Sequence, residues 1–206
     1  MKIEEMVKKL EGVQTVESVM ALLGVTKQKA IYYLHRMRKK GYLKAKRTSL
    51  KKRVYNISFE NKLEGGSYYD IINQHSPMKL AARDTYKVYG KRLTPEDAIV
   101  FAVKTKSLRT ILASLPLFNH VKDWPSLYRS ARKEGVEREI GALYDVARKN
   151  IKVRRMNRHY RANAAPKIKS EFHFIIEGMK SKDYKGIENE WKVYIPFNKI
   201  DLEEIK

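Results

Sequence analysis

The sequence contains no cysteine and no long apolar run. The lack of cysteine excludes disulfides, a thiol nucleophile and cysteine-based zinc or iron–sulfur sites. The apolar runs are a few residues long, far short of the roughly 20 residues needed to cross a bilayer. The charged residues Lys2, Glu4 and Glu5 follow Met1, where a leader peptide would have its apolar core. We therefore expect a soluble, cytoplasmic protein with no membrane partner.

Acidic residues are scarce: 23 Asp and Glu stand against 44 Lys and Arg, which gives a formal charge of +21. The excess is concentrated, since residues 1–58 carry 15 basic and 4 acidic residues, and residues 147–170 carry 9 basic and no acidic residues. The alternative is that the lysines simply keep the protein soluble, but that account has to explain both the size and the clustering of the charge. A concentrated positive field is typical of proteins that bind a polyphosphate, so nucleic acid is the leading partner class.

Residues 1–59 show three short helical patterns followed by two alternating runs. Apolar residues at helical spacing predict helices over Ile3–Leu10, from Thr15 to Gly24, and from Thr26 to Lys40. Gly24-Val25-Thr26 joins the last two as a helix-turn-helix. Alternation in residues 42–47 and 53–58 predicts a β-hairpin. Three helices closed by a basic hairpin is the order of a winged helix.

The stretch GVTKQKAIYYLHRMRKKGYL resembles the recognition-helix segment of winged-helix transcription regulators. It has a small residue at Ala30, large apolar residues at Leu34 and Met37, and Gly41 where the wing opens. The resemblance implies that residues 1–59 are a winged-helix domain that binds double-stranded DNA.

Residues 60–67 are polar, contain a glycine pair and read as a linker to a second domain, residues 68–206. Helix-start signals at Thr94-Pro95 and Asp123-Trp124-Pro125 predict a mainly helical first part. Further helices are expected from Leu108 and over residues 137–148. Short strands are expected over Ile151–Met156, Phe172–Ile176 and Trp191–Ile195. The predicted fold class is therefore α+β: an N-terminal winged helix-turn-helix followed by a mainly helical domain with late β-strands.

The run from Leu112 to Lys149 resembles the helical part of AbiEi-type antitoxins, which are transcriptional regulators of abortive-infection toxin systems. The shared features are Asp123-Trp124 followed by Leu127, then Gly135, Arg138 and the step Gly141-Ala142-Leu143. Such antitoxins also begin with a winged helix. The resemblance implies a repressor of its own operon with a toxin protein as partner, and regulators of this kind often act as homodimers.

Three groups of residues are predicted to contact DNA. Gln28 near the start of the third helix can present a bidentate amide to adenine, whereas the hairpin cations are expected to bind phosphates. The basic segment 147–170 is expected to lie as an arm along the backbone. The alternatives are a solvated helix face, and a loop whose charges pair with acids such as Glu171 and Glu177. The predicted residues are Thr26, Lys27, Gln28, Lys29, Tyr32, Tyr33 and Arg36 in the helix, Lys46, Arg47, Lys51, Lys52 and Arg53 in the hairpin, and Arg154, Arg155, Arg158 and Arg161 in the segment.

Two rival functions remain open. Asp183 with Glu190-Trp191-Lys192 resembles the acid and E-x-K pattern of metal-dependent nucleases, in which carboxylates hold Mg²⁺ and a lysine polarises water. An RNA-binding module would use the same positive charge. The five histidines are dispersed without ligand spacing and no glycine-rich phosphate loop is present, so the sequence predicts no metal and no cofactor. The leading expectation is a non-enzymatic DNA-binding regulator.

Overall fold

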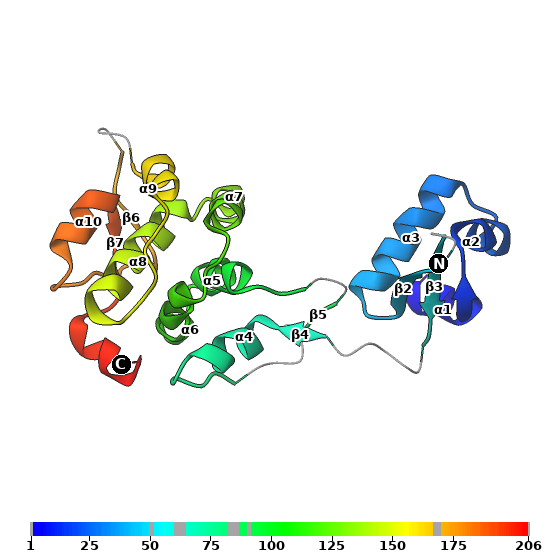
Figure 1. Ribbon diagram of the computed structural model, residues 1–206, viewed down its shortest axis with the longest axis horizontal. Coiled ribbons are helices and arrows are strands. Elements are labelled where there is room, and N and C mark those ends of the chain that lie inside the picture. The colour runs from blue at the N-terminus through cyan, green and yellow to red at the C-terminus, as the bar shows by residue number, and fades with distance from the viewer. Residues whose placement is uncertain are drawn as a thin grey trace. The chain divides into compact units, whose positions relative to one another are not determined.

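The computed structural model describes residues 2–49, 52–59, 65–81, 87–89, 92–166 and 170–205. The chain is mixed α+β with small sheets, and it divides into two compact units (Figure 1). The first unit comprises residues 1–66 and 87–92, and the second comprises residues 67–86 and 93–206. Across the described ranges, no helix combines the length and the apolarity needed to cross a membrane.

The first unit is built from three helices and a small antiparallel sheet. The strand order in the sheet is β1-β3-β2, so the middle strand is the last of the three in the chain. Ile57 pairs with Gly12 on one side and with Leu43 on the other. The elements in chain order are α1 (Ile3–Lys9), β1 (Gly12–Gln14), α2 (Val16–Leu23), α3 (Lys27–Lys39), β2 (Leu43–Arg47) and β3 (Arg53–Ile57).

Local signals explain where α2 and α3 begin and end. The hydroxyl of Thr15 accepts a hydrogen bond from the Ser18 amide at 3.2 Å, which caps α2, and Gly24 ends the helix with φ 62° in the left-handed region. Thr26 occupies the N-cap position of α3, but its hydroxyl makes no capping hydrogen bond. The helices and the predicted hairpin thus form where the sequence indicates them, whereas β1 was not predicted.

The core of the first unit gathers one face of each helix and the inner residues of the sheet. Helix α3 contributes Ala30, Leu34 and Met37, all of them buried. The residues of this core are Ile3, Met6, Val7, Leu10, Val19, Ala30, Leu34, Met37, Leu43 and Ile57.

Two contacts close the first unit around this core. The carboxylate of Glu11 accepts a hydrogen bond from the amide of Phe59 at 3.1 Å, which joins the residue before β1 to the end of the hairpin. The ring of Tyr89, in the part of the first unit formed by residues 87–92, lies against Gly41, where a Cβ would stand 2.6 Å from the ring. Gly41 also has φ 82°, so both its conformation and its neighbour require glycine.

The second unit is mainly helical, with α8 in contact with several of its helices (Figure 1). Within the described segments, the regular strands that lie wholly in this unit are β6 and β7, which pair in parallel. The two-residue strand β4 (Gly66–Ser67) spans the division of the chain, and β5 (Lys87–Val88) belongs to the first unit. The elements that lie wholly in the second unit are α4 (Tyr68–His75), α5 (Pro95–Lys104), α6 (Leu108–Ser114), η2 (Leu115–Asn119), α7 (Trp124–Glu134), α8 (Glu137–Asn150), α9 (Arg158–Ala164), β6 (His173–Phe174), α10 (Lys185–Trp191), β7 (Val193–Tyr194) and η3 (Lys199–Ile205).

Two helix starts in this unit follow the predicted signals. Thr94 accepts from the Asp97 amide at 3.2 Å ahead of Pro95, and Asp123 accepts from the Ser126 amide at 2.8 Å at the start of α7. Gly135 ends α7 with φ 67°. These local rules place α5 and α7 before any tertiary contact is considered.

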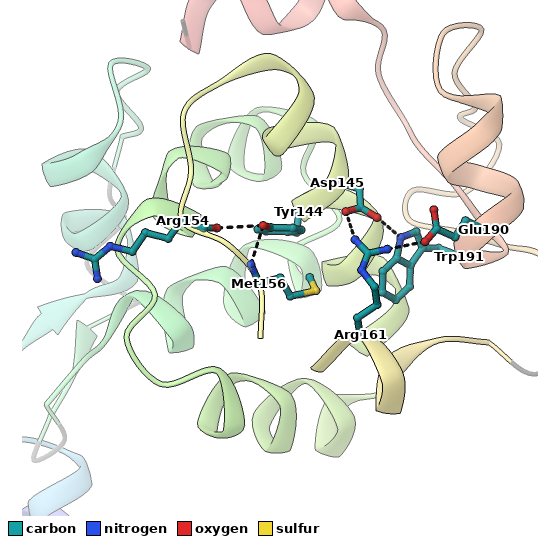
Figure 2. A network of polar contacts seen from close by, with 7 residues as sticks. All are labelled: Tyr144, Asp145, Arg154, Met156, Arg161, Glu190 and Trp191. Carbon is teal, nitrogen blue, oxygen red and sulfur yellow. Dashed lines mark hydrogen bonds and ion pairs between the residues drawn. The ribbon is translucent and has the colours of Figure 1, made fainter. Parts of the chain in front are cut away.

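The predicted strand over Ile151–Met156 is wrong, because this stretch is irregular. Its backbone bonds to a side chain rather than to a neighbouring strand: the Tyr144 hydroxyl accepts from the Met156 amide at 2.7 Å and donates to the Arg154 carbonyl at 3.1 Å (Figure 2). The other two predicted strands shrink to the two-residue β6 and β7. Helices α4, α9 and α10 were not predicted.

Candidate nucleic-acid interface

The outward face of α3 carries one continuous stripe of polar and aromatic side chains. Gln28, Tyr32, His35 and Lys39 are spaced four, three and four residues apart, so they lie on one side of the helix, and all four are exposed. This side is opposite the buried residues of α3. His35 and Lys39 were not predicted, although helical spacing from Gln28 places them on the same side of the helix.

The other predicted residues of α3 flank this stripe. Lys27, Lys29 and Arg36 are exposed, and the Arg36 guanidinium lies over the Tyr32 ring at 5.7 Å from its centroid. Tyr33 is half-buried against the core of the first unit, so the structure assigns it to packing rather than to the outward face. Ile31, which was not predicted, is 49% exposed beside the stripe.

The start of α3 is open. Thr26 is exposed, and its hydroxyl makes no capping bond to the first turn. The helix begins with Lys27 and Lys29 and has no acidic residue in its first turn. Because the first amides of a helix point outward and carry partial positive charge, this end of α3 favours an anion.

The hairpin extends the positive charge away from the core. Lys46 lies opposite Val54 on the sheet face away from the core residues, and Arg47 lies opposite Arg53 near the turn. Lys52 is exposed and its carbonyl accepts from the Thr48 amide at 2.8 Å. The predicted contact residue Lys51 lies outside the described residues. The remaining hairpin cations are therefore exposed in the part of the hairpin that is described.

The second basic block is folded against the second unit rather than extended as an arm over its described part, residues 147–166 and 170. Arg154, Arg155 and Arg158 are exposed. Arg161 on α9 instead forms ion pairs with Asp145 of α8 and, at 2.5 Å, with Glu190 of α10 (Figure 2). Arg161, which the sequence predicts as a phosphate contact, is thus paired internally, with acids other than those the sequence suggested.

The groups around Arg161 favour its charged form. Burial by itself lowers the pKa of Arg161, but the hydrogen bond and the charge of Asp145 outweigh it, so the pKa is raised. The guanidinium also lies 5.3 Å from the centroid of the Trp191 ring, and the Trp191 indole donates to Asp145 at 2.6 Å. This cluster joins α8, α9 and α10.

The residues of the nuclease alternative each have another partner. Asp183 accepts from the Lys199 amide at 2.8 Å, Glu190 pairs with Arg161, and the Lys192 amine lies 4.9 Å from the centroid of the Phe172 ring. Among the described residues, no group of three or more His, Cys, Asp or Glu side chains is placed to hold a metal ion.

Compared with known proteins, the chain matches no family model, no curated protein and no solved structure.

Proposed function

We propose that the protein is a DNA-binding transcriptional regulator whose first unit is a winged helix and whose helix α3 enters the major groove. The observation that carries the proposal is the order of elements. In chain order, α1 is followed by β1, then by α2, α3 and the β2–β3 hairpin, and the second hairpin strand, β3, pairs with β1 as well as with β2. This arrangement agrees with the family resemblance of the α3 segment.

The outward stripe of α3 would read the bases. A major groove about 12 Å wide admits an α-helix, and a glutamine amide can bond both the N6 and the N7 of adenine. Gln28 lies near the open start of α3, where recognition helices contact base edges. Tyr32 follows one turn later, and the guanidinium of Arg36 lies over its ring. Gln28 is therefore the residue that we expect to set sequence preference.

The cations around α3 would supply affinity rather than preference. Lys27, Lys29, Arg47 and Arg53 are exposed, and phosphate contacts position a protein on the duplex without reading its sequence. Bound at a promoter, such a protein blocks access to the duplex, which is how a repressor acts. The same cations would steer the first encounter with DNA.

The test is a gel-shift titration of the full chain against duplex DNA from upstream of its own coding region, at several salt concentrations. We expect one fragment to stay bound in excess nonspecific competitor. Gln28→Ala should change which site is preferred, and Lys29→Ala should weaken binding. Lys9→Ala serves as the matched control, because Lys9 is an exposed helical lysine on α1, outside the proposed interface.

Three outcomes would contradict the proposal. If excess nonspecific competitor abolishes the binding of every DNA fragment, the protein is not a sequence-specific regulator. Tighter binding to hairpin RNA than to duplex DNA would favour the RNA-binding module. Metal-dependent cleavage that is lost in Glu190→Ala would favour the nuclease.

The antitoxin role is a narrower proposal within this one. The residues that carry the resemblance serve packing here: Trp124 and Leu127 are buried, Gly135 is left-handed and Gly141 faces Trp191. They support a similar helical arrangement without marking a surface for a toxin. Co-expression with the neighbouring reading frame of the operon tests the role, with rescue of growth as the expected result and unrelieved toxicity, or no toxicity to relieve, as the opposing one.

A further inference from the structure

The second unit contains a pocket in which half of the lining residues are arginines. Its volume is about 360 Å³, and it lies between α8, the irregular segment 151–157 and α9. Four arginines and one acid supply its charged lining, with the amide of Asn157 beside them. These side chains are Arg148, Arg155, Arg158, Arg161 and Asp145.

The pocket is held in shape by hydrogen bonds that leave most of the arginine nitrogens open. The hydroxyl of Tyr144, a buried residue of α8, bonds the backbone of the segment on either side of Arg155. Arg148 donates from one nitrogen to the carbonyl of Val153. The Asn157 side chain accepts from the His159 amide at 2.7 Å and caps α9. The wall that carries Arg155 and Arg158 is thus fixed to α8.

The one acid of the pocket is already neutralised. One oxygen of Asp145 pairs with Arg161, and the other accepts from the Trp191 indole at 2.6 Å (Figure 2). Arg161 is in turn shared with Glu190. The negative charge of Asp145 is therefore paired with Arg161, and it does not compensate the positive charges of the other three arginines.

Arg155 and Arg158 are exposed and have no hydrogen-bond or ion-pair partner among the residues that the structure describes. Together with Arg148 they place three uncompensated positive charges around one hollow. Like charges gathered in this way repel one another, and an anion bound between them would remove that repulsion. The guanidinium fork matches the oxygens of a phosphoryl group, to which it can donate two parallel hydrogen bonds.

We propose that this pocket binds the phosphoryl group of a small phosphate-bearing ligand. Its volume lies within the range of about 300–1,000 Å³ that is typical of small-molecule sites, and it is far too small to admit a duplex. The pocket belongs to the second unit and α3 belongs to the first, and the proposal does not depend on DNA binding by the first unit. The phosphoryl group can be carried by a free nucleotide or by the 5′ end of a strand, and the chemistry of the site is the same for both.

The test is calorimetric titration of the full chain with inorganic phosphate, pyrophosphate, a nucleoside 5′-monophosphate and a short single strand with or without a 5′-phosphate. We expect saturable binding of at least one phosphorylated probe and a thermal stabilisation of about 3 °C at tenfold excess over the dissociation constant. The strand should bind more tightly with its 5′-phosphate than without it. Binding of the mononucleotide alone assigns a free ligand, and binding of the phosphorylated strand alone assigns a strand end; both support the phosphoryl site.

The double variant Arg155→Gln with Arg158→Gln should weaken binding at least tenfold, because each arginine contributes charged hydrogen bonds. Arg154→Gln is the matched control. It removes one positive charge next to Arg155, against two in the double variant, but the Arg154 side chain extends away from Asp145 and Arg161 (Figure 2) and does not line the pocket. Its carbonyl bond to Tyr144 is unaffected by the substitution.

Two results would overturn the proposal. One is the absence of saturable binding of every phosphorylated probe by the unaltered chain. The other is an equal loss in Arg154→Gln and in the double variant, which would mean that the surface attracts anions without a defined site. Unchanged thermal unfolding of all variants in the absence of ligand confirms that the comparison is between folded proteins.

Discussion

Arg47 and Arg53 lie directly opposite each other across the β2–β3 pair. Like charges in this position destabilise a sheet, and neither arginine has an ion-pair partner among the described residues. The hairpin therefore carries a repulsion that an anion would relieve.

Arg53→Thr should change stability and DNA affinity in opposite directions. Relief of the repulsion, with a good strand former in place of arginine, should stabilise the first unit by about 0.2–1 kcal/mol. Loss of one phosphate contact should weaken DNA binding and reduce the slope of log K against log salt by about 0.9. Urea unfolding and salt-dependent gel shifts measure the two effects.

The matched control for stability is Lys44→Thr, because Lys44 lies on the same strand pair opposite Asn56 rather than opposite a cation. It should bring no gain from relieved repulsion. Equal stabilisation by both variants would mean that strand propensity, and not the opposed charges, is responsible.

Removal of the Asp145 carboxylate should cost far more than removal of Glu190. Asp145→Ala leaves both Arg161 and the Trp191 indole without their partner, and the Asp145 side chain is only 13% exposed. We expect a loss of about 2–3 kcal/mol in the free energy of unfolding. Glu190 is 55% exposed, so Glu190→Ala should cost about 0–1 kcal/mol. Similar losses in the two variants, measured by urea unfolding, would contradict the central position of Asp145.

Two glycine substitutions in helices should have opposite signs. Gly141 on α8 faces the ring of Trp191, and a Cβ there would overlap the ring, so Gly141→Ala should destabilise the second unit by about 1–3 kcal/mol. Gly186 on α10 has nothing within 4 Å of a new Cβ, so Gly186→Ala should stabilise it by about 0.5–1 kcal/mol. Thermal unfolding measures both, and a neutral Gly141→Ala would show that α8 and α10 are not in close contact.

The second unit should lose stability as the pH falls through the usual histidine range. The rings of His75 and His120 stack with centroids 3.9 Å apart, and burial, together with the charge of His120, lowers the pKa of His75. The unfolded chain then takes up a proton at a higher pH than the folded unit does, so acid favours unfolding. We expect the urea midpoint to fall between about pH 7 and pH 5, by less in His75→Gln.

His159→Gln is the control for this pH dependence, since His159 is an exposed histidine of α9 and its ring has no partner within the described segments. It should leave the pH dependence unchanged. If His75→Gln keeps the full dependence, another group is responsible.

The elements that the sequence predicts well are those set by short-range signals. Thr15, Gly24 and Asp123 act on backbone groups within a few residues of themselves. The helix ends that they define can therefore be predicted from the local sequence without knowledge of the fold. Helix α4 has a signal of the same kind that was not used: Ser67 and Asp70 form a capping box, in which the Ser67 amide donates to Asp70 at 2.8 Å.

The features that could not be predicted depend on residues far apart in the chain. The segment 151–156 has the composition of a strand, but Tyr144 takes its backbone bonds. Arg161 stands in a basic run that suggests a phosphate contact, and its partner Glu190 comes 29 residues later. The outward stripe of α3 can be predicted in part, because helical spacing defines its residues once the buried face of the helix is known.

The contact of Tyr89 with Gly41 means that the first unit is not a continuous stretch of polypeptide. The chain passes from one unit to the other after residue 66, returns after residue 86 and leaves again after residue 92. A single proteolytic cut after residue 66 leaves residues 87–92 of the first unit on the same fragment as the second unit, so the contact of Tyr89 with Gly41 would then join two separate fragments. A gene fragment that stops at residue 66 would encode the proposed DNA-binding helix α3 without Tyr89, the residue whose ring covers Gly41.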